Sequence, residues 1–312
     1  MRDLIKEIRR GNARAIAKAI SLVENDAAAA QKLMRQVFSW RKDAVILGIT
    51  GAPGTGKSTL VDKLIGRLRA SERKLGIVAV DPSSPFSGGA ILGDRIRMMR
   101  HSADSDVFIR SMATRGHLGG LARATGDAIA IFEAAGKDYV LVETVGVGQD
   151  EVEVVKLADL VLVVLTPDAG DEIQAFKAGI MEIADIFVIN KADHPGAEKM
   201  ERQLRAMLDL GLPGKDKPPV VKTVATKGKG IDGVISGVDR LMGKRDRRVQ
   251  EVRRKRLLAW MLRDVTREKI DQLISRDIPD SVFMEYVDQI YHRRTDPYTV
   301  ADKLIARLKE KT

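Results

Sequence analysis

The chain has no cysteine among its 312 residues, and this absence removes several functional classes at once. A disulfide-stapled scaffold, a thiol nucleophile and a cysteine-ligated metal site are all excluded. Aromatic residues make up only 4% of the chain, so platforms on which nucleic-acid bases could stack are scarce. No stretch is long and uncharged enough to cross a bilayer, and the N-terminal segment lacks the apolar centre of a signal peptide. We therefore expect a soluble, cytoplasmic protein.

Positive charge, by contrast, is abundant, with a formal net charge of +10. Such an excess would suit a nucleic acid or another acidic partner. Much of it lies in "KRDRRVQEVRRKR", residues 244–256. The solvated face of a helix is the commoner explanation for a run of this kind, and we favour it over a nucleic-acid surface.

The stretch "GAPGTGKST", residues 51–59, has the pattern of a phosphate-binding loop and directly follows the apolar run "AVILGIT". Its glycines allow successive backbone N–H groups to point at phosphate oxygens, and the next helix adds its positive N-terminal end. Lys57 would neutralise the β- and γ-phosphates, and Ser58 would offer its hydroxyl to Mg²⁺. The expected phosphate contacts are Gly51, Ala52, Pro53, Gly54, Thr55, Gly56, Lys57, Ser58 and Thr59.

Three regions of the chain differ in their patterns. Residues 1–42 and 244–312 show helical spacing of apolar residues without strand signals, whereas residues 43–243 alternate short apolar runs with helical stretches. The apolar runs are "AVILGIT", "LGIVAVD", "DVFIRS", "DYVLVET", "DLVLVVLTP", "DIFVINK" and "PPVVKTVA". Such runs between helices predict a mostly parallel sheet covered on both faces. We expect an α/β P-loop NTPase domain between an N-terminal and a C-terminal helical extension.

The segment "NKAD", residues 190–193, indicates which base is bound. A carboxylate at Asp193 can accept both the ring N–H and the amine of guanine, whereas adenine presents an acceptor at the corresponding ring position. Asn190 can tie this segment to the phosphate loop, and the stem of Lys191 can lie against the base. A second base loop is expected in "KTVATKGKGID", with the backbone N–H of Ala225 facing the guanine oxygen. We therefore favour guanine over adenine.

Acidic residues near strand ends are candidates for a metal site. Glu143 lies at the end of "DYVLVET", Asp81 ends "LGIVAVD", and Asp94 begins a predicted helix after an "SGG" loop. Carboxylates that converge on a nucleotide can position a metal ion and water. Asp81 could instead be a turn former before proline, although its position at a strand end favours the metal site. For Asp94, a helix N-cap is an equal alternative.

For several other residues, the neighbouring sequence does not indicate one function alone. Gly146 can sense the γ-phosphate through its backbone, and Val147 stands where small GTPases carry the glutamine that orients water, so that hydrolysis is expected to be slow until something completes the site. Arg110, Arg115 and His117 could face phosphate or a partner, or be solvated. Asp171, Glu172, Gln174 and Lys177 begin a predicted helix, where acidic residues are ordinary.

Taken together, "GAPGTGKST", "VDPSSPFSGGAILGDRIRM", "RSMATRGHLGG", "ETVGVGQ", "AGDEIQ" and "NKAD" closely resemble the MeaB/ArgK family of P-loop GTPases, densely over residues 48–193. The resemblance implies a homodimer that binds GTP, GDP and Mg²⁺ and assists an adenosylcobalamin-dependent acyl-CoA mutase, usually methylmalonyl-CoA mutase. GTP binding and hydrolysis would then gate cofactor loading and the removal of damaged cobalamin.

The resemblance also implies roles for single residues. Lys57 and Ser58 would bind phosphate and Mg²⁺, while Asp81, Asp94 and Glu143 would form the acidic environment of the metal. The segment after Glu143 would be a mobile switch, and "AGDEIQAFK" a further one that signals to the mutase. Residues 244–312, with Leu257, Leu258, Trp260 and Met261, would mediate dimerisation. Val224 and Lys229 replace the Ser and Glu of the pattern "TSAxTGEGI", a departure that bears on affinity more than on base specificity.

Two other functional classes are weighed against this one. A nickel-insertion GTPase is disfavoured because the absence of cysteine and four scattered histidines leave poor nickel ligands. A basic, nucleotide-dependent module that binds RNA or another polyanion is the non-enzymatic alternative. Salt-dependent retention on RNA would favour that module, whereas nucleotide-dependent retention on a mutase would favour the chaperone.

Overall fold

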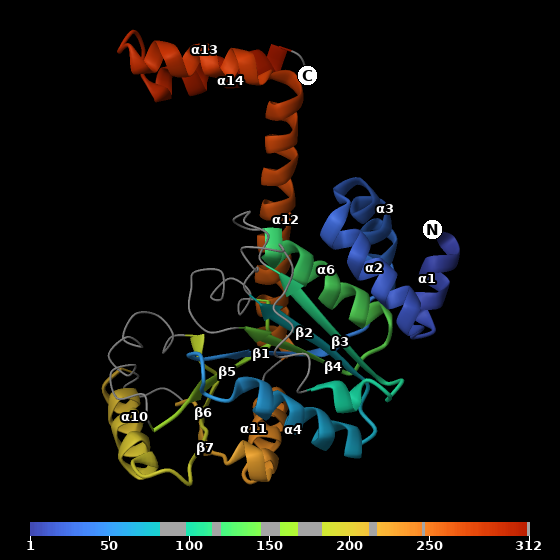
Figure 1. Cartoon of the computed structure of the whole chain (residues 1–312), viewed down its shortest axis with the longest axis vertical. Coiled ribbons are helices and arrows are strands. Elements are labelled where there is room, and N and C mark those ends of the chain that lie inside the picture. The colour runs from blue at the N-terminus through green and yellow to red at the C-terminus, as the bar shows by residue number, and fades with distance from the viewer. Residues whose placement is uncertain are drawn as a thin grey trace. The chain divides into compact units, whose positions relative to one another are not determined.

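The computed structural model describes residues 1–81, 98–113, 120–144, 157–167, 183–211, 217–244 and 247–310 (Figure 1). Its internal contacts group the chain into two compact units, residues 1–257 and 258–312. The first unit contains the sheet and most of the helices, and the second is helical. The boundary between the units falls inside a long helix, whereas the sequence pattern suggests a boundary after residue 243.

Seven parallel strands form a sheet in the order β3-β2-β4-β1-β5-β6-β7. They are β1 (Val45–Thr50), β2 (Leu75–Asp81), β3 (Val107–Ala113), β4 (Tyr139–Thr144), β5 (Leu160–Leu165), β6 (Ile186–Ile189) and β7 (Val220–Lys222). The α/β P-loop fold and the seven apolar runs predicted as strands are confirmed. Every residue of β4, β5 and β6 is buried, as expected when helices cover both faces of a sheet. Because all strands are parallel, their carboxyl ends meet at one edge, where α/β folds bind ligands.

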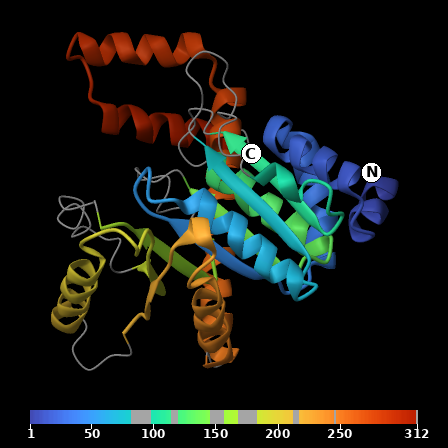
Figure 2. The same cartoon turned by 60° about the horizontal axis from the view of Figure 1, so that its bottom comes forward.

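Helices cover both faces of this sheet (Figures 1 and 2). On one face α4 (Lys57–Ala70) packs beside α11 (Ile231–Lys244), over a core that includes Leu64 and Val234. On the other face lies α6 (Gly120–Ala134), whose Phe132 covers Gly76 of β2 so closely that a Cβ there would be 2.6 Å from the ring. The described part of the sheet region also contains η2 (Met99–His101), α10 (Ala197–Gly211) and η3 (Ala225–Lys227).

Three short helices precede the sheet. They are α1 (Arg2–Arg9), α2 (Ala13–Asn25) and α3 (Ala27–Val37), followed by η1 (Phe38–Trp40). Asn12 caps α2 by accepting hydrogen bonds from the N–H groups of Arg14 and Ala15, and Asp26 caps α3. The apolar side of α2, with Ile16 and Ile20 fully buried, packs on α6. The N-terminal extension is therefore a further layer on the α6 face.

The chain ends in α12 (Arg247–Asp277), α13 (Asp280–Tyr291) and α14 (Pro297–Glu310). The start of α12 belongs to the first unit, where Arg254 forms an ion pair with Asp43 and donates to the carbonyl oxygen of Ala44 at 3.2 Å. None of the helices in the described ranges is long and apolar enough to cross a membrane.

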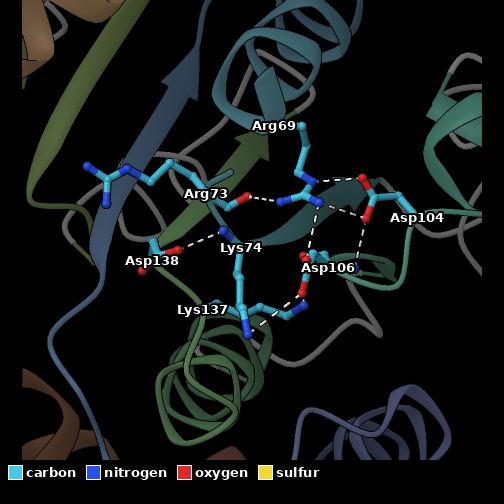
Figure 3. Close-up of polar contacts among 7 residues, drawn as sticks. All are labelled: Arg69, Arg73, Lys74, Asp104, Asp106, Lys137 and Asp138. Carbon is cyan, nitrogen blue, oxygen red and sulfur yellow. Dashed lines mark hydrogen bonds and ion pairs between the residues drawn. The ribbon is translucent and has the colours of Figure 1, made fainter. Parts of the chain in front are cut away.

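A cluster of ion pairs joins α4, β2, β3 and β4 at the amino ends of the strands (Figure 3). Arg69 donates to Asp104 at 2.7 Å and to Asp106 at 3.2 Å, and its hydrogen bond holds the pKa of Asp104 below the usual range. Lys137 is only 4% exposed, and its Nζ donates to the carbonyl oxygen of Asp106 at 2.8 Å. Burial lowers the pKa of Lys137 from 10.5 to about 8. This ammonium group is therefore a destabilising element at neutral pH.

We expect the free energy of unfolding to rise with pH through a window set by Lys137. Its pKa is about 8 in the folded chain and 10.5 as the reference value, so between these limits the unfolded state binds more protons. Stability therefore increases from pH 8 to pH 10.5, by an amount on the order of 2 kcal/mol. Lys137→Met should remove this rise in denaturant titrations across that range. Lys74→Met, at an exposed neighbour whose charge lowers the pKa of Lys137 less than burial does, should keep most of the rise. A rise that persists unchanged in Lys137→Met would contradict the assignment.

Candidate nucleotide-binding site

The phosphate loop connects β1 to α4 at the carboxyl edge of the sheet. Gly51, Gly54 and Gly56 have φ angles of 144°, 80° and 87°, which residues with a side chain rarely adopt. A Cβ on Gly51 would lie 2.2 Å from the carbonyl oxygen of Val164, and one on Gly56 would lie 2.5 Å from Nδ2 of Asn190. The path of the backbone therefore requires glycine here, as a loop with inward-pointing N–H groups does.

Lys57 begins α4, and its side chain is buried against this loop. Its Nζ donates to the carbonyl oxygens of Gly51 at 2.7 Å and Ala52 at 2.9 Å. The hydroxyl of Thr55 donates to the same Ala52 oxygen at 2.9 Å. An ammonium group held in this position, at the N-terminus of a helix, gives the loop the positive potential that attracts phosphate.

Ser58 and Glu143 bring α4 and β4 together. The hydroxyl of Ser58 donates to Oε1 of Glu143 at 2.6 Å, and both side chains are buried. Glu143 is in register with Ile49 of β1, one residue before that strand ends. A hydroxyl and a carboxylate beside a phosphate loop fit Mg²⁺, which is usually held by one or two protein oxygens together with phosphate oxygens and water. In the described ranges, no group of three or more His, Asp or Glu side chains could hold a metal ion by itself.

The structure places the backbone of Asp81 at the last position of β2, in register with Ala113 of β3. The preceding residue, Val80, is in register with Thr144, which follows Glu143 in β4. Asp81 and Glu143 therefore belong to the same edge of the sheet as the phosphate loop.

Asn190 connects the phosphate loop to the two expected base loops. Its Nδ2 donates to the carbonyl oxygen of Thr55 at 2.8 Å, which is the tie to the phosphate loop that the sequence predicts. Its Oδ1 accepts from the hydroxyl of Thr223 and from the backbone N–H of Ala225, both at 3.1 Å. The side chain is 3% exposed, so these bonds are shielded from water. One amide thus holds three segments against each other.

Asp193 lies in the turn after β6 and is partly exposed, so a ligand can reach its carboxylate. Lys191, two residues earlier, has a φ of 54°, and its carbonyl oxygen accepts from the N–H of His194 at 2.9 Å. The carboxylate of Asp193 accepts from Nζ of Lys227 at 2.8 Å. This hydrogen bond lowers the pKa of Asp193 and so further favours the ionised carboxylate.

Several residues predicted for the site lie outside the described part of the chain. They are Asp94, Arg115, His117, Gly146, Val147, Asp171, Glu172, Gln174 and Lys177. Arg110 is described, and it forms an ion pair with Glu24 of α2 and donates to the hydroxyl of Ser21 at 3.1 Å. Its contacts therefore join β3 to the N-terminal helices.

Two contributors to the site do not appear among the sequence-based candidates. Thr223 and Lys227 both lie in the stretch proposed as the second base loop. The sequence therefore identifies this loop but does not predict which contacts its side chains make. Thr223 reaches Asn190, and Lys227 reaches Asp193. The sequence signal is the pair of glycines at 228 and 230, whose φ angles of 68° and 81° form the tight turn that presents Lys227.

A glycine-lined loop after a buried strand, with Lys57 inside it and a guanine-type loop tied to it, defines a P-loop nucleotide-binding protein. The chain belongs to the family of methylmalonyl-CoA mutase-associated GTPases, MeaB, whose sequence model matches residues 16–277. It is accordingly a GTPase of the α/β P-loop class, and its family implies that it binds a guanine nucleotide.

Individual relatives are similar to this chain over most of its length, which is consistent with this family. A protein of Pyrococcus abyssi named as a GTPase is 47% identical, over 98% of this chain and 96% of its own length. GTPase ArgK of Escherichia coli is 31% identical, over 95% of this chain and 93% of its own. The methylmalonic aciduria type A homolog of Mus musculus, a mitochondrial protein, is 36% identical over 71% of this chain and 58% of its own length. The crystal structure of an LAO/AO transport system kinase superposes with a TM-score of 0.69 at 26% identity, covering 98% of this chain and 97% of that one.

Proposed function

We propose that this GTPase is a chaperone of an adenosylcobalamin-dependent acyl-CoA mutase, with methylmalonyl-CoA mutase as the first candidate. GTP binding and hydrolysis would gate the loading of the cofactor and the protection of the mutase. The single observation that carries the proposal is the match of the mutase-associated GTPase family to residues 16–277. The hydrogen bonds of Asn190 to the phosphate loop and to the second base loop support it, because a nucleotide can control connected segments through small changes at one site.

In this proposal the nucleotide lies across the carboxyl edge of the sheet. The loop of residues 51–56 and the N-terminus of α4, through Thr59, would surround the phosphates, while Asn190, Lys191, Asp193 and Ala225 would surround guanine. The N–H of Ala225 already has Asn190 as acceptor, so it would share its proton with the guanine oxygen. Gly146 would face the γ-phosphate.

Lys57, Asp81, Asp94 and Glu143 are proposed as the residues that support hydrolysis. Ser58 and Glu143 would hold Mg²⁺ together with Asp81 and Asp94, and the buried bond between Ser58 and Glu143 keeps two of these oxygen donors in place. Bound Mg²⁺ would neutralise negative charge on the phosphate oxygens. Lys57 would move its hydrogen bonds from the loop carbonyls to phosphate, because a charged acceptor binds an ammonium group more strongly than a neutral one.

The second unit is proposed to bind another copy of the same chain. In its described residues, only Ile278 and Val300 are buried large apolar side chains. The exposed ones are Leu258, Leu262, Ile270, Leu273, Phe283, Met284, Val287, Tyr291, Tyr298 and Ile305. A helical unit that buries so little of its own apolar surface is typical of one half of an interface.

Ending the chain after residue 257 is therefore expected to convert a dimer into a monomer that still binds GTP, because the first unit retains the whole candidate site. Sedimentation velocity would report the mass, and nucleotide titration should give an affinity within about twofold of the full chain. Full-length protein that sediments as a monomer at micromolar concentration would contradict the proposed dimer.

The chaperone proposal is tested by nucleotide-dependent association with the mutase of the same organism. Immobilised full-length chain, loaded with a non-hydrolysable GTP analogue or with GDP, should retain the mutase to clearly different extents. Retention of RNA that falls as salt rises, with no retention of the mutase in either nucleotide state, would instead favour a polyanion-binding module.

A further inference from the structure

Lys227 contacts the carboxylate on which base selection is proposed to depend. Its Nζ lies 2.8 Å from Oδ2 of Asp193, and the two side chains come from separate loops, one after β7 and one after β6. These loops are joined beneath the ion pair by two hydrogen bonds, from the N–H of Ala192 to the carbonyl oxygen of Thr223 at 3.0 Å and from the N–H of Ala225 to Asn190.

The backbone around Lys227 is held in a tight turn. Lys227 is the last residue of η3, and its N–H donates to the carbonyl oxygen of Val224 at 2.9 Å. Val224 in turn forms a bridge with Lys229, donating to its carbonyl oxygen at 3.0 Å. Gly230 packs so closely on β7 that a Cβ would lie 2.1 Å from the carbonyl oxygen of Lys222. The backbone position from which the Lys227 side chain extends is therefore fixed by the loop.

This ion pair contributes little to the stability of the fold. The side chain of Lys227 is 59% exposed and that of Asp193 is 38% exposed, and surface pairs of this kind have small effects on unfolding. Its consequence lies in the chemistry of the carboxylate. Lys227 lowers the pKa of Asp193 further below its ordinary value, and it occupies one of about four lone-pair positions on the two carboxylate oxygens.

We infer that Lys227 is a specificity-determining residue of the base pocket, and that it makes the pocket tolerant of purines that lack the 2-amino group. The inference rests on the proposed guanine site. Guanine donates to Asp193 from its ring N–H and its amine, whereas hypoxanthine donates from the ring N–H alone. With Lys227 present, the second carboxylate oxygen keeps a charged partner when hypoxanthine is bound. The hydrogen bond from the guanine amine also contributes less to binding, because the carboxylate oxygen that accepts it is already bonded to a cation.

Both effects have the same sign. Without the Lys227 ammonium, the oxygen left over by hypoxanthine loses its charged partner. A polar group that a bound ligand shields from water and leaves unpaired is a strong source of discrimination between related ligands. The preference for guanine over hypoxanthine nucleotides should therefore be weak in the natural chain and stronger after the charge at 227 is removed. Adenine nucleotides should be rejected in either case, because adenine presents an acceptor where Asp193 needs a donor.

The test compares the affinities of the full-length chain for GDP and IDP by calorimetry. In Lys227→Met, which keeps the apolar stem, the ratio of the two affinities should shift toward GDP by at least about fivefold. Lys229→Met removes the same charge from the same loop at a side chain for which no contact with Asp193 is described, and it should change the ratio by less than about twofold. Lys227→Arg, which restores a cation, should return the ratio toward that of the natural chain.

An unchanged ratio in Lys227→Met, or an equal shift in Lys229→Met, would overturn the inference while leaving GDP binding in place. Failure of the natural chain to bind GDP would instead remove the proposed guanine site itself. A thermal melt of each variant separates both outcomes from misfolding, because the exposed pair is expected to leave the melting temperature unchanged.

Discussion

Lys57→Ala is expected to lower the affinity for GTP by roughly a hundredfold and to abolish its hydrolysis. The buried ammonium of Lys57 lies inside the phosphate loop, 2.7 Å and 2.9 Å from two loop carbonyl oxygens. Losing a hydrogen bond to a charged phosphate costs about 1.5–3 kcal/mol, which is between tenfold and about 150-fold in affinity. Titration with a fluorescent GTP analogue and a phosphate-release assay would measure the two effects.

The matched control for this variant is Arg67→Ala. Arg67 lies on the same helix and carries the same charge, but it forms an exposed ion pair with Asp232. Its removal should leave the affinity for GTP within about twofold, since surface pairs contribute little. A folded Lys57→Ala protein that still binds GTP as tightly as the natural chain would place the phosphates elsewhere.

Asp193→Asn is expected to change the preferred base from guanine to xanthine. The carboxylate is proposed to accept two hydrogen bonds from guanine, and losing this charge-assisted contact should cost on the order of 2–4 kcal/mol, or about 30- to 1000-fold in affinity for GTP. An amide at this position can donate to the carbonyl that xanthine carries at carbon 2. Competition binding with GTP and xanthosine triphosphate would measure the exchange.

Asp209→Asn provides the comparison, because Asp209 also forms an exposed ion pair, with Lys217, but lies on α10. It should leave the preference for GTP in place. An Asp193→Asn protein with an unaltered affinity for GTP would remove Asp193 from the base pocket.

The architecture could be predicted from sequence because its signals are local. Each strand of the sheet is a short apolar run between helices, and burial on both faces leaves no polar residue within β5 or β6 to confuse the pattern. The phosphate loop is equally local, since Gly51, Gly56, Lys57 and Ser58 are nearly adjacent along the chain. Once the strands are known to be parallel, the carboxyl ends of β1, β4 and β6 are predicted to lie at one edge of the sheet.

Contacts between distant segments could not be predicted in this way. The pairing of Arg110 with Glu24 depends on how α2 packs beside β3 and α6, which no short pattern encodes. The contact between Lys227 and Asp193 depends on the turn geometry of two loops 34 residues apart. Asn190 is intermediate: its bond to Thr55 follows from the motif, whereas its bonds to Thr223 and Ala225 require the structure.

The proposed chaperone function is tested most directly by the rate of phosphate release from GTP. This rate would be measured for the full-length chain with and without its mutase. Val147 stands where small GTPases carry the water-orienting glutamine, so the partner is expected to complete the site by ordering neighbouring segments. At saturating GTP the mutase should raise the rate at least about tenfold, equivalent to about 1.4 kcal/mol of barrier, and Lys57→Ala should show no such rise. A rate that is the same with and without the mutase would contradict the chaperone function and leave a GTPase without this partner.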